Sequence, residues 1–193
     1  MTQQRIAWWA ILLPMTAVVI WSLNIVVTRY VTNFIEPMSI SFYRWLLAWL
    51  LLTPFMLHKT LQQRHLIQQH SLKLAIVSAF GMLLYQGLAY SAAHYTTATN
   101  MGLINAFIPI FTIFVGILIL KEFPNRYAVI GSICSFLGLL YVIGQGQFNA
   151  ILNLGQHTGD LLMLLAVFFY AFYGVFLRKW QLALPLMLML YVQ

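Results

Sequence analysis

The amino-acid sequence predicts an all-α integral membrane protein, a polytopic bundle of membrane-spanning helices. Of its 193 residues, 62% are apolar and 7% are charged, whereas soluble domains carry about 25% charged residues. The mean hydropathy is +0.86. Apolar stretches recur along the chain, and most have close to the roughly 20 residues that a helix needs to cross a bilayer. These observations exclude a water-soluble globular domain.

Six complete spans are expected. The first covers residues 6–27 and is longer than the core of a signal peptide, which has about 7–15 residues, so we interpret it as a retained span. The others cover residues 38–57, 74–93, 98–120, 127–143 and 161–177. The span at 127–143 is rich in small residues, which allow helices to approach closely. A seventh apolar stretch opens at Leu182, and we expect the sequence to be cut within this span at Gln193.

The cations are distributed unevenly between the two sides of the membrane. If the spans alternate in direction, one side carries Arg29, and the other carries Arg5, Lys59, Arg64, Lys73, Lys121, Arg126, Arg178 and Lys179. Because cytoplasmic loops are enriched in Lys and Arg, we expect a cytoplasmic amino terminus and a location in the cell inner or plasma membrane. The net charge of +7 therefore reflects topology, and the expected surroundings are a lipid bilayer rather than nucleic acid.

The first and sixth spans resemble each other. Residues 17–31 (AVVIWSLNIVVTRYV) align with residues 166–180 (AVFFYAFYGVFLRKW), which places Trp21 opposite Tyr170. An odd number of spans separates the two copies, so the second copy would cross the membrane in the inverted direction. Inverted repeats are a building plan of secondary transporters, which hold substrate near the midplane between the repeats. We therefore expect a five-span unit at residues 1–149 and the start of an inverted second unit at residues 150–193.

Several features resemble a known family when they are taken in order. They are Trp21-Ser22-Leu23-Asn24 with Arg29, then Pro37 followed by Arg44, and then the run from Leu88 to Gly138 with its small residues, Pro109 and Glu122. On these residues the chain resembles the EamA-type transporters of the drug/metabolite transporter superfamily along essentially its whole length. The resemblance implies a carrier of small metabolites or drugs that is built from two inverted five-span units. This chain departs from that pattern because its second unit is nearly absent.

Arg44 is the strongest candidate for a substrate contact. It lies within the second span, and an ionisable side chain at such a position usually faces a cavity or a partner. Its guanidinium presents a fork of N–H donors that suits a carboxylate or a phosphate. The alternative is that the side chain reaches the outer interface, which begins near Pro37, roughly 10 Å away along the helix.

Four more residues complete the hypothetical substrate site: Asn24, Gln86, Tyr90 and Asn105. Polar side chains within a bundle need hydrogen bonds, and contacts between helices or with a substrate can supply them. For each amide alone, packing between helices is the simpler interpretation. The bolder hypothesis is that these residues line one polar pocket together with Arg44.

Two prolines and one pair of charges are assigned structural roles. Pro14 in the first span and Pro109 in the fourth each leave a backbone carbonyl without its helical partner, so each predicts a kink or a hinge. Glu122 follows Lys121 directly, and we interpret Glu122 and Lys121 as a structural ion pair at the cytoplasmic end of the fourth span.

Secondary transport is the function that the sequence favours, by alternating access and with a small-molecule metabolite or drug as substrate. The acids are far apart, the histidines lie in loops, and Cys134 is the only cysteine. We therefore predict no catalytic residues, no metal site and no cofactor. The alternative is a membrane fragment that is inactive or depends on assembly. In that case a second copy in a homodimer, or a partner chain, would supply the missing spans.

Overall fold

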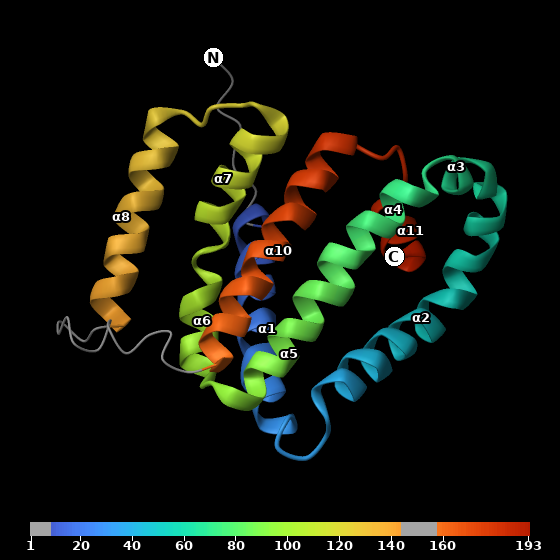
Figure 1. Cartoon of the computed structure of the whole chain (residues 1–193). Coiled ribbons are helices and arrows are strands. Elements are labelled where there is room, and N and C mark those ends of the chain that lie inside the picture. The colour runs from blue at the N-terminus through green and yellow to red at the C-terminus, as the bar shows by residue number, and fades with distance from the viewer. Residues whose placement is uncertain (1–8, 144–157) are drawn as a thin grey trace.

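The computed structural model describes residues 9–143 and 158–193, which form a bundle of helices (Figure 1). Within these ranges the structure contains no β-strand. The segments long and apolar enough to cross a membrane are Leu12–Val31, Pro37–Gln62, Ser71–Tyr95, Ala98–Leu120 and Thr158–Trp180. The predicted class, an all-α polytopic membrane protein, is therefore confirmed.

Several helices are longer than the apolar runs that predicted them. Helix α1 (Trp9–Val31) ends four residues later than expected, and its expected start at residue 6 lies outside the described residues. Helix α2 (Pro37–Gln62) extends beyond residue 57, and α10 (Thr158–Trp180) is three residues longer at each end. Apolar content marks only the part of a helix that lies in hydrocarbon. A helix can continue beyond it into the polar interface.

The third and fourth spans are interrupted helices. The third consists of α4 (Ser71–Ser78), a π-helical segment η1 (Ala79–Leu84) and α5 (Tyr85–Tyr95). The fourth consists of α6 (Ala98–Asn105) and α7 (Ile108–Leu120). Pro109 lies in the first turn of α7, where its missing N–H is not needed for the helix. Pro14 lies inside α1, which continues on both sides of it.

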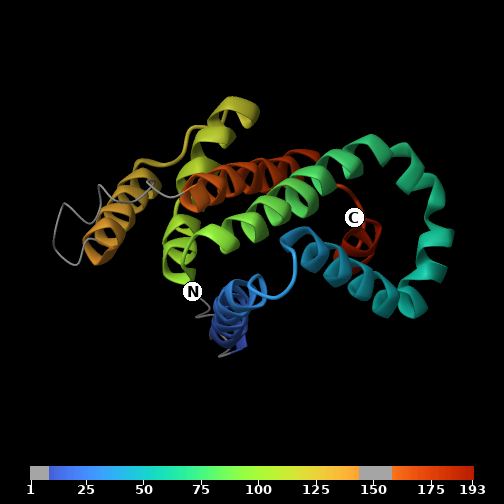
Figure 2. The same cartoon turned by 60° about the horizontal axis from the view of Figure 1, so that its bottom comes forward.

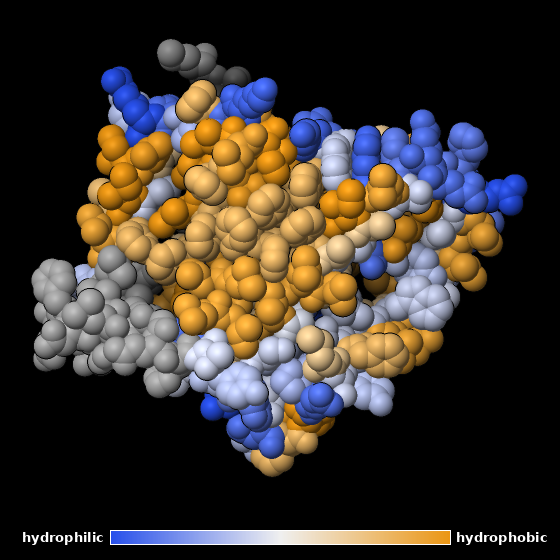
Figure 3. All heavy atoms as spheres, in the orientation of Figure 1, coloured by the Kyte–Doolittle hydropathy of each residue, from blue (hydrophilic) through white to orange (hydrophobic). Residues whose placement is uncertain are grey.

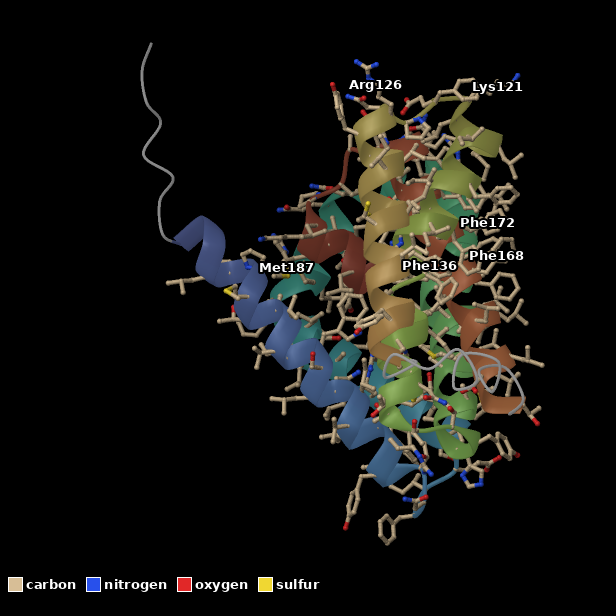
Figure 4. All side chains as sticks on the ribbon, turned by 90° about the vertical axis from the view of Figure 1, so that its left-hand side faces the viewer. Lys121, Arg126, Phe136, Phe168, Phe172 and Met187 are labelled. Atoms are coloured by element: carbon tan, nitrogen blue, oxygen red, sulfur yellow. The ribbon has the colours of Figure 1, made fainter. Side chains whose placement is uncertain are left out.

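Three shorter or peripheral helices complete the described chain. Helix α3 (Arg64–Gln69) connects α2 to α4. Helix α8 (Arg126–Ile143) stands at the edge of the bundle (Figures 1 and 4), where the ring of Phe136 meets that of Phe107 at 4.9 Å. The stretch expected from Leu182 becomes helical at α11 (Leu186–Val192) and packs against α2, with the rings of Tyr191 and Trp49 stacked.

Helix α10 lies between α5 and α7 (Figures 1 and 2). Met163, Ala166 and Val167 are buried against α5 and α6. Toward the other end of α10, Ala171 and Val175 are buried against Val115 of α7. The apolar core is therefore built around the sixth span, which runs opposite to α1 in Figure 1.

Gly159 marks the closest approach of α10 to the end of α5. A Cβ atom at this position would lie 2.7 Å from the carbonyl carbon of Tyr95 and 2.8 Å from the backbone nitrogen of Thr96. These are backbone atoms, which cannot rotate away as a side chain can. The absence of a side chain at Gly159 therefore allows the two helices to meet at this point.

Charged residues gather at one end of the bundle, which we call the basic end. It lies at the top of Figure 1 and includes the loops that follow α2, α7 and α10, with Lys59, Arg64, Lys73, Lys121, Arg126, Arg178 and Lys179. Apolar side chains occupy the middle of the surface in Figure 3. The opposite end carries Arg29 and Glu36 near the turn between α1 and α2. That the basic end is cytoplasmic stays a prediction.

Replacing Gly159 with alanine is expected to destabilise the protein. The added methyl group would overlap backbone atoms of α5, and overpacking of this kind costs about 1–3 kcal/mol. Thermal unfolding of the detergent-purified chain measures the effect. Gly174→Ala on the same helix is the matched control, because a Cβ at Gly174 meets no atom within 4 Å. Equal midpoints for the two variants would contradict the close approach.

Candidate functional site

A cavity of about 650 Å³ lies between α1, α2, α5, α6 and α10. The structure brings all five residues of the expected substrate site to its wall, namely Asn24, Arg44, Gln86, Tyr90 and Asn105. Thr28 adds a hydroxyl. These residues come from four different helices, so only the tertiary arrangement collects them.

The guanidinium of Arg44 is directed toward α5. Its Nη1 donates a hydrogen bond to the hydroxyl of Tyr90, whose side chain is buried. The guanidinium carbon also lies 5.0 Å from the ring centre of Trp45 and 5.6 Å from that of Tyr90, distances at which a cation is attracted to an aromatic face. This geometry disfavours the alternative in which Arg44 reaches the outer interface.

The positive charge of Arg44 is not balanced by a carboxylate in the described structure. The one salt bridge within residues 9–143 and 158–193 joins Arg178 to Glu122, and no acidic residue lines the cavity. A hydrogen bond to a phenol orients a guanidinium but leaves its charge in place. The cavity wall is therefore cationic.

Two helices present polar residues to the cavity at helical spacing. On α1 these are Asn24 and Thr28, and on α5 they are Gln86 and Tyr90. Residues four apart lie on the same face of a helix, so each pair forms a short polar stripe. Outside these stripes the cavity-lining residues of α1 and α5 are mostly apolar or aromatic.

Asn105 ends α6 just before the break at residues 106–107. Its side-chain oxygen is buried and has no hydrogen-bond partner within the described part of the chain. Leaving such an acceptor unsatisfied costs about 1–3 kcal/mol. The break thus places an amide with unused hydrogen-bonding capacity at the wall of the cavity.

Aromatic rings form the remaining wall. Tyr85 and Tyr170 have ring centres 4.6 Å apart, and Tyr170 lies 6.2 Å from Trp21. The candidate site expected from the sequence did not include Tyr170 or the cavity-lining Met101 and Met163. The signal that could have found Tyr170 is the repeat, because the alignment places it opposite Trp21.

Asp160 is buried at the amino-terminal end of α10, although the apolar span expected there begins only at residue 161. It is in the first turn of α10 and is only 2% exposed. Thr96 donates a hydrogen bond to its Oδ1, and the side-chain nitrogen of Asn100 lies 3.3 Å from the same atom. A carboxylate is also favoured at a helix amino terminus. The available sequence signal was an acid placed directly before a long apolar run.

Glu122 pairs with Arg178 rather than with Lys121. Its Oε2 lies 2.6 Å from a guanidinium nitrogen of Arg178, and both side chains are exposed. Lys121 ends α7 in the left-handed conformation, at φ 57°. The side chains of sequence neighbours diverge, whereas the end of α10 arrives beside Glu122. The pair therefore connects α7 to α10.

The described residues contain no group of three or more histidine, cysteine, aspartate or glutamate side chains that could hold a metal ion. Arg44, Asn105 and the aromatic wall instead place a few polar groups in a largely apolar cavity, an arrangement that is usual for small-molecule sites.

Known proteins similar to this chain are named as transporters. An uncharacterized transporter of Bacillus subtilis (strain 168), YyaM, is 24% identical over 151 residues, which cover 78% of this chain and 50% of that relative. An uncharacterized transporter of Archaeoglobus fulgidus is 26% identical over 168 residues, which cover 86% of this chain and 55% of that relative. The chain thus spans about half the length of these curated relatives. The comparison with solved structures gives no significant match.

The family comparison covers most of the chain. Residues 8–144 match the model of the EamA-like transporter family. The match includes the described helices from α1 to α8, and with them the cavity residues of the first four spans. The resemblance found in the sequence motifs is therefore confirmed, and the chain belongs to the EamA-like transporter family.

Proposed function

We propose that this chain forms the substrate cavity of a secondary transporter that moves a small anionic metabolite or drug by alternating access. The observation that carries the proposal is the guanidinium of Arg44. It lies at the wall of a cavity within the bundle, is held by Tyr90, and is not neutralised by a carboxylate in the described residues.

The charge of the cavity supports an anionic substrate. A guanidinium has five N–H donors, and Tyr90 accepts from one of them. Donors that Tyr90 does not use are suited to two oxygens of a carboxylate or phosphate in parallel. The amides of Asn24, Gln86 and Asn105 could bind further polar groups of the same molecule.

The size and the aromatic wall support an amphipathic molecule. A volume of about 650 Å³ lies within the range of roughly 300–1,000 Å³ that is usual for small-molecule sites. Trp21, Tyr85 and Tyr170 offer ring faces against which an apolar body can pack. The proposal assigns no catalytic step and no cofactor to these residues.

The arrangement of α1 and α10 supports the inverted repeat of residues 1–149 and 150–193. The two helices run in opposite directions in Figure 1. The aligned residues Trp21 and Tyr170 contact each other, as expected for equivalent positions near a two-fold axis. We propose that the rest of the second unit completes the cavity, with the amino terminus cytoplasmic in the inner membrane.

The alternative of an assembly-dependent fragment keeps one specific observation in its favour. Only 6% of the span window in α1 is buried. A helix that lines a substrate cavity normally packs against neighbours, so α1 lacks contacts that a second unit, a second copy or a partner chain would supply. Binding of an anion by the isolated chain distinguishes the two proposals.

The Arg44→Gln variant is expected to bind anionic ligands about ten- to a hundredfold more weakly, because charge-assisted hydrogen bonds are lost. The measurement is the thermal stabilisation of the purified chain by a panel of small carboxylates and phosphates, each beside its uncharged analogue. Arg29→Gln is the control, since Arg29 bonds to Asn33 at the opposite end from the basic end. Unchanged affinity in Arg44→Gln would contradict the proposed role of Arg44.

Tyr90→Phe is expected to weaken anion binding less than Arg44→Gln, because the guanidinium keeps its charge but loses the hydroxyl that orients it. If Tyr90 acts through Arg44, the double variant should bind no more weakly than Arg44→Gln alone. The same stabilisation assay measures all three variants. Additive losses would show that Tyr90 contributes to binding independently of Arg44.

A further inference from the structure

The cavity is closed at the end opposite the basic end. Met101 and Met163 line it there and are almost fully buried. One turn or more beyond them toward this end lie Thr96 and Asp160, which are 4% and 2% exposed. This packing of α5, α6 and α10 seals the cavity from the opposite end.

The side toward the basic end is different. The described apolar side chains of α1 between Leu12 and Leu23 are 42% to 69% exposed. Figure 4 shows α1 leaning away from the other helices toward the end where Lys121 and Arg126 lie. The main contacts of α1 are with α5 and α6, and Trp21 also lies beside Tyr170 of α10. No described residue of α1 before Ala17 lines the cavity. Within the described residues the cavity is therefore packed closed at the opposite end and less covered toward the basic end.

Polar contacts join the helices at the closed end. Between α1 and α5, Nδ1 of His94 lies 3.1 Å from the backbone oxygen of Thr32. The hydroxyl of Thr32 donates to the backbone oxygen of Arg29 at 3.0 Å and lies 3.5 Å from that of Ala93. Between the α5–α6 corner and α10, Thr96 and Asn100 donate to the carboxylate of Asp160. We call these two sets of contacts polar seams. The first is a bond from a side chain to the backbone, and the second joins side chains.

Polar seams of this kind are suited to opening. A hydrogen bond within a protein can be exchanged for one to water with little net change in free energy, whereas an apolar contact between helices offers entering water nothing to bond to. The contact between α7 and α10 on the other side is apolar and involves Val115, Ala171 and Val175. Water entering from the opposite end could therefore separate the seams while α7 and α10 stay packed.

From this asymmetry we propose that Asp160 is the latch of a gate at the closed end. In the conformation described, its carboxylate holds the turn between α5 and α6 against α10, while the contact of His94 with the backbone oxygen of Thr32 holds the end of α1 against α5. Release of Thr96 and Asn100 from Asp160, together with separation of the Thr32 seam, opens the cavity to the opposite side. Asp160 is a positioning residue in this scheme and does not contact the substrate. The inference rests on the proposed alternating-access function and names its gate.

Thiol accessibility tests the latch. The reporter is Asn24→Cys, which lies on the cavity wall, in a Cys134→Ala background that removes the exposed native thiol. The full chain is labelled with a membrane-impermeant maleimide in vesicles of both orientations, and Lys179→Cys marks the basic face. We expect the reporter to react from the basic face and to be protected from the opposite face.

Weakening the latch should expose the reporter from the opposite face. Loss of one buried hydrogen bond is expected to raise labelling from that face about tenfold in either Asp160→Asn or Thr96→Val. Glu122→Gln is the control, because it breaks an exposed ion pair at the basic end and should leave labelling from the opposite face unchanged. Thr96→Ser keeps the hydroxyl and should behave like the parent.

Two results would overturn the latch. One is equal labelling of the parent from both faces. The other is parental protection in latch variants that still react from the basic face and are therefore folded. If Asp160→Asn does not insert, Thr96→Val decides the matter, because it removes only the donor. The assay needs no substrate, so protection that depends on Asp160 supports the gate even if no anion binds. If anion binding depends on Arg44 but labelling does not depend on Asp160, the proposed carrier function is supported and the proposed gate is contradicted.

Discussion

The bilayer interior offers no hydrogen bonds to side chains, and this constraint organises the polar contacts between the spans. Arg44 of α2 donates to Tyr90, Nδ1 of His94 bonds to the backbone oxygen of Thr32 just beyond α1, and Thr96 donates to Asp160 of α10. In each case one partner belongs to α5 or to the residue that ends it. Helix α5 therefore collects the polar contacts, whereas α10 collects the apolar packing, and the cavity lies where these two helices meet α1 and α2.

Two helix–turn–helix segments of the chain, α1 with α2 and α10 with α11, are similar in arrangement. Helix α1 is followed by a turn and by α2, which begins at Pro37, and α10 is followed by a turn and by α11, which begins after Pro185. The turn after α10 lies at the basic end and the turn after α1 at the opposite end (Figure 1). This is the arrangement expected if the two segments are inverted copies. The first of these segments brings Arg44 to the cavity. When Pro37 is aligned with Pro185, the position of the second segment that corresponds to Arg44 is Val192. The proposed inverted repeat therefore carries the cation of the cavity in its first unit, without a counterpart at the corresponding position, Val192.

The fold class and most of the spans could be predicted because hydropathy is a local property of the sequence. The five cavity residues could also be anticipated, since a polar side chain in an apolar span has few favourable surroundings. The faces along which helices pack could not be predicted, because lipid-facing and protein-facing surfaces are equally apolar. For this reason the central position of α10, the burial of Asp160, the contact of Tyr170 with Trp21 and the pairing of Glu122 with Arg178 emerged only from the structure.

The unbalanced charge of Arg44 also connects substrate binding to closure in the proposed carrier. Closing the basic end over an empty cavity would remove water from a guanidinium that has no carboxylate partner in the described residues, and an unpaired buried charge is strongly unfavourable. An anion bound to Arg44 would neutralise that charge before the water leaves. The loaded cavity would then close more readily than the empty one, so the residue that recognises the substrate would also oppose movement of the carrier without it.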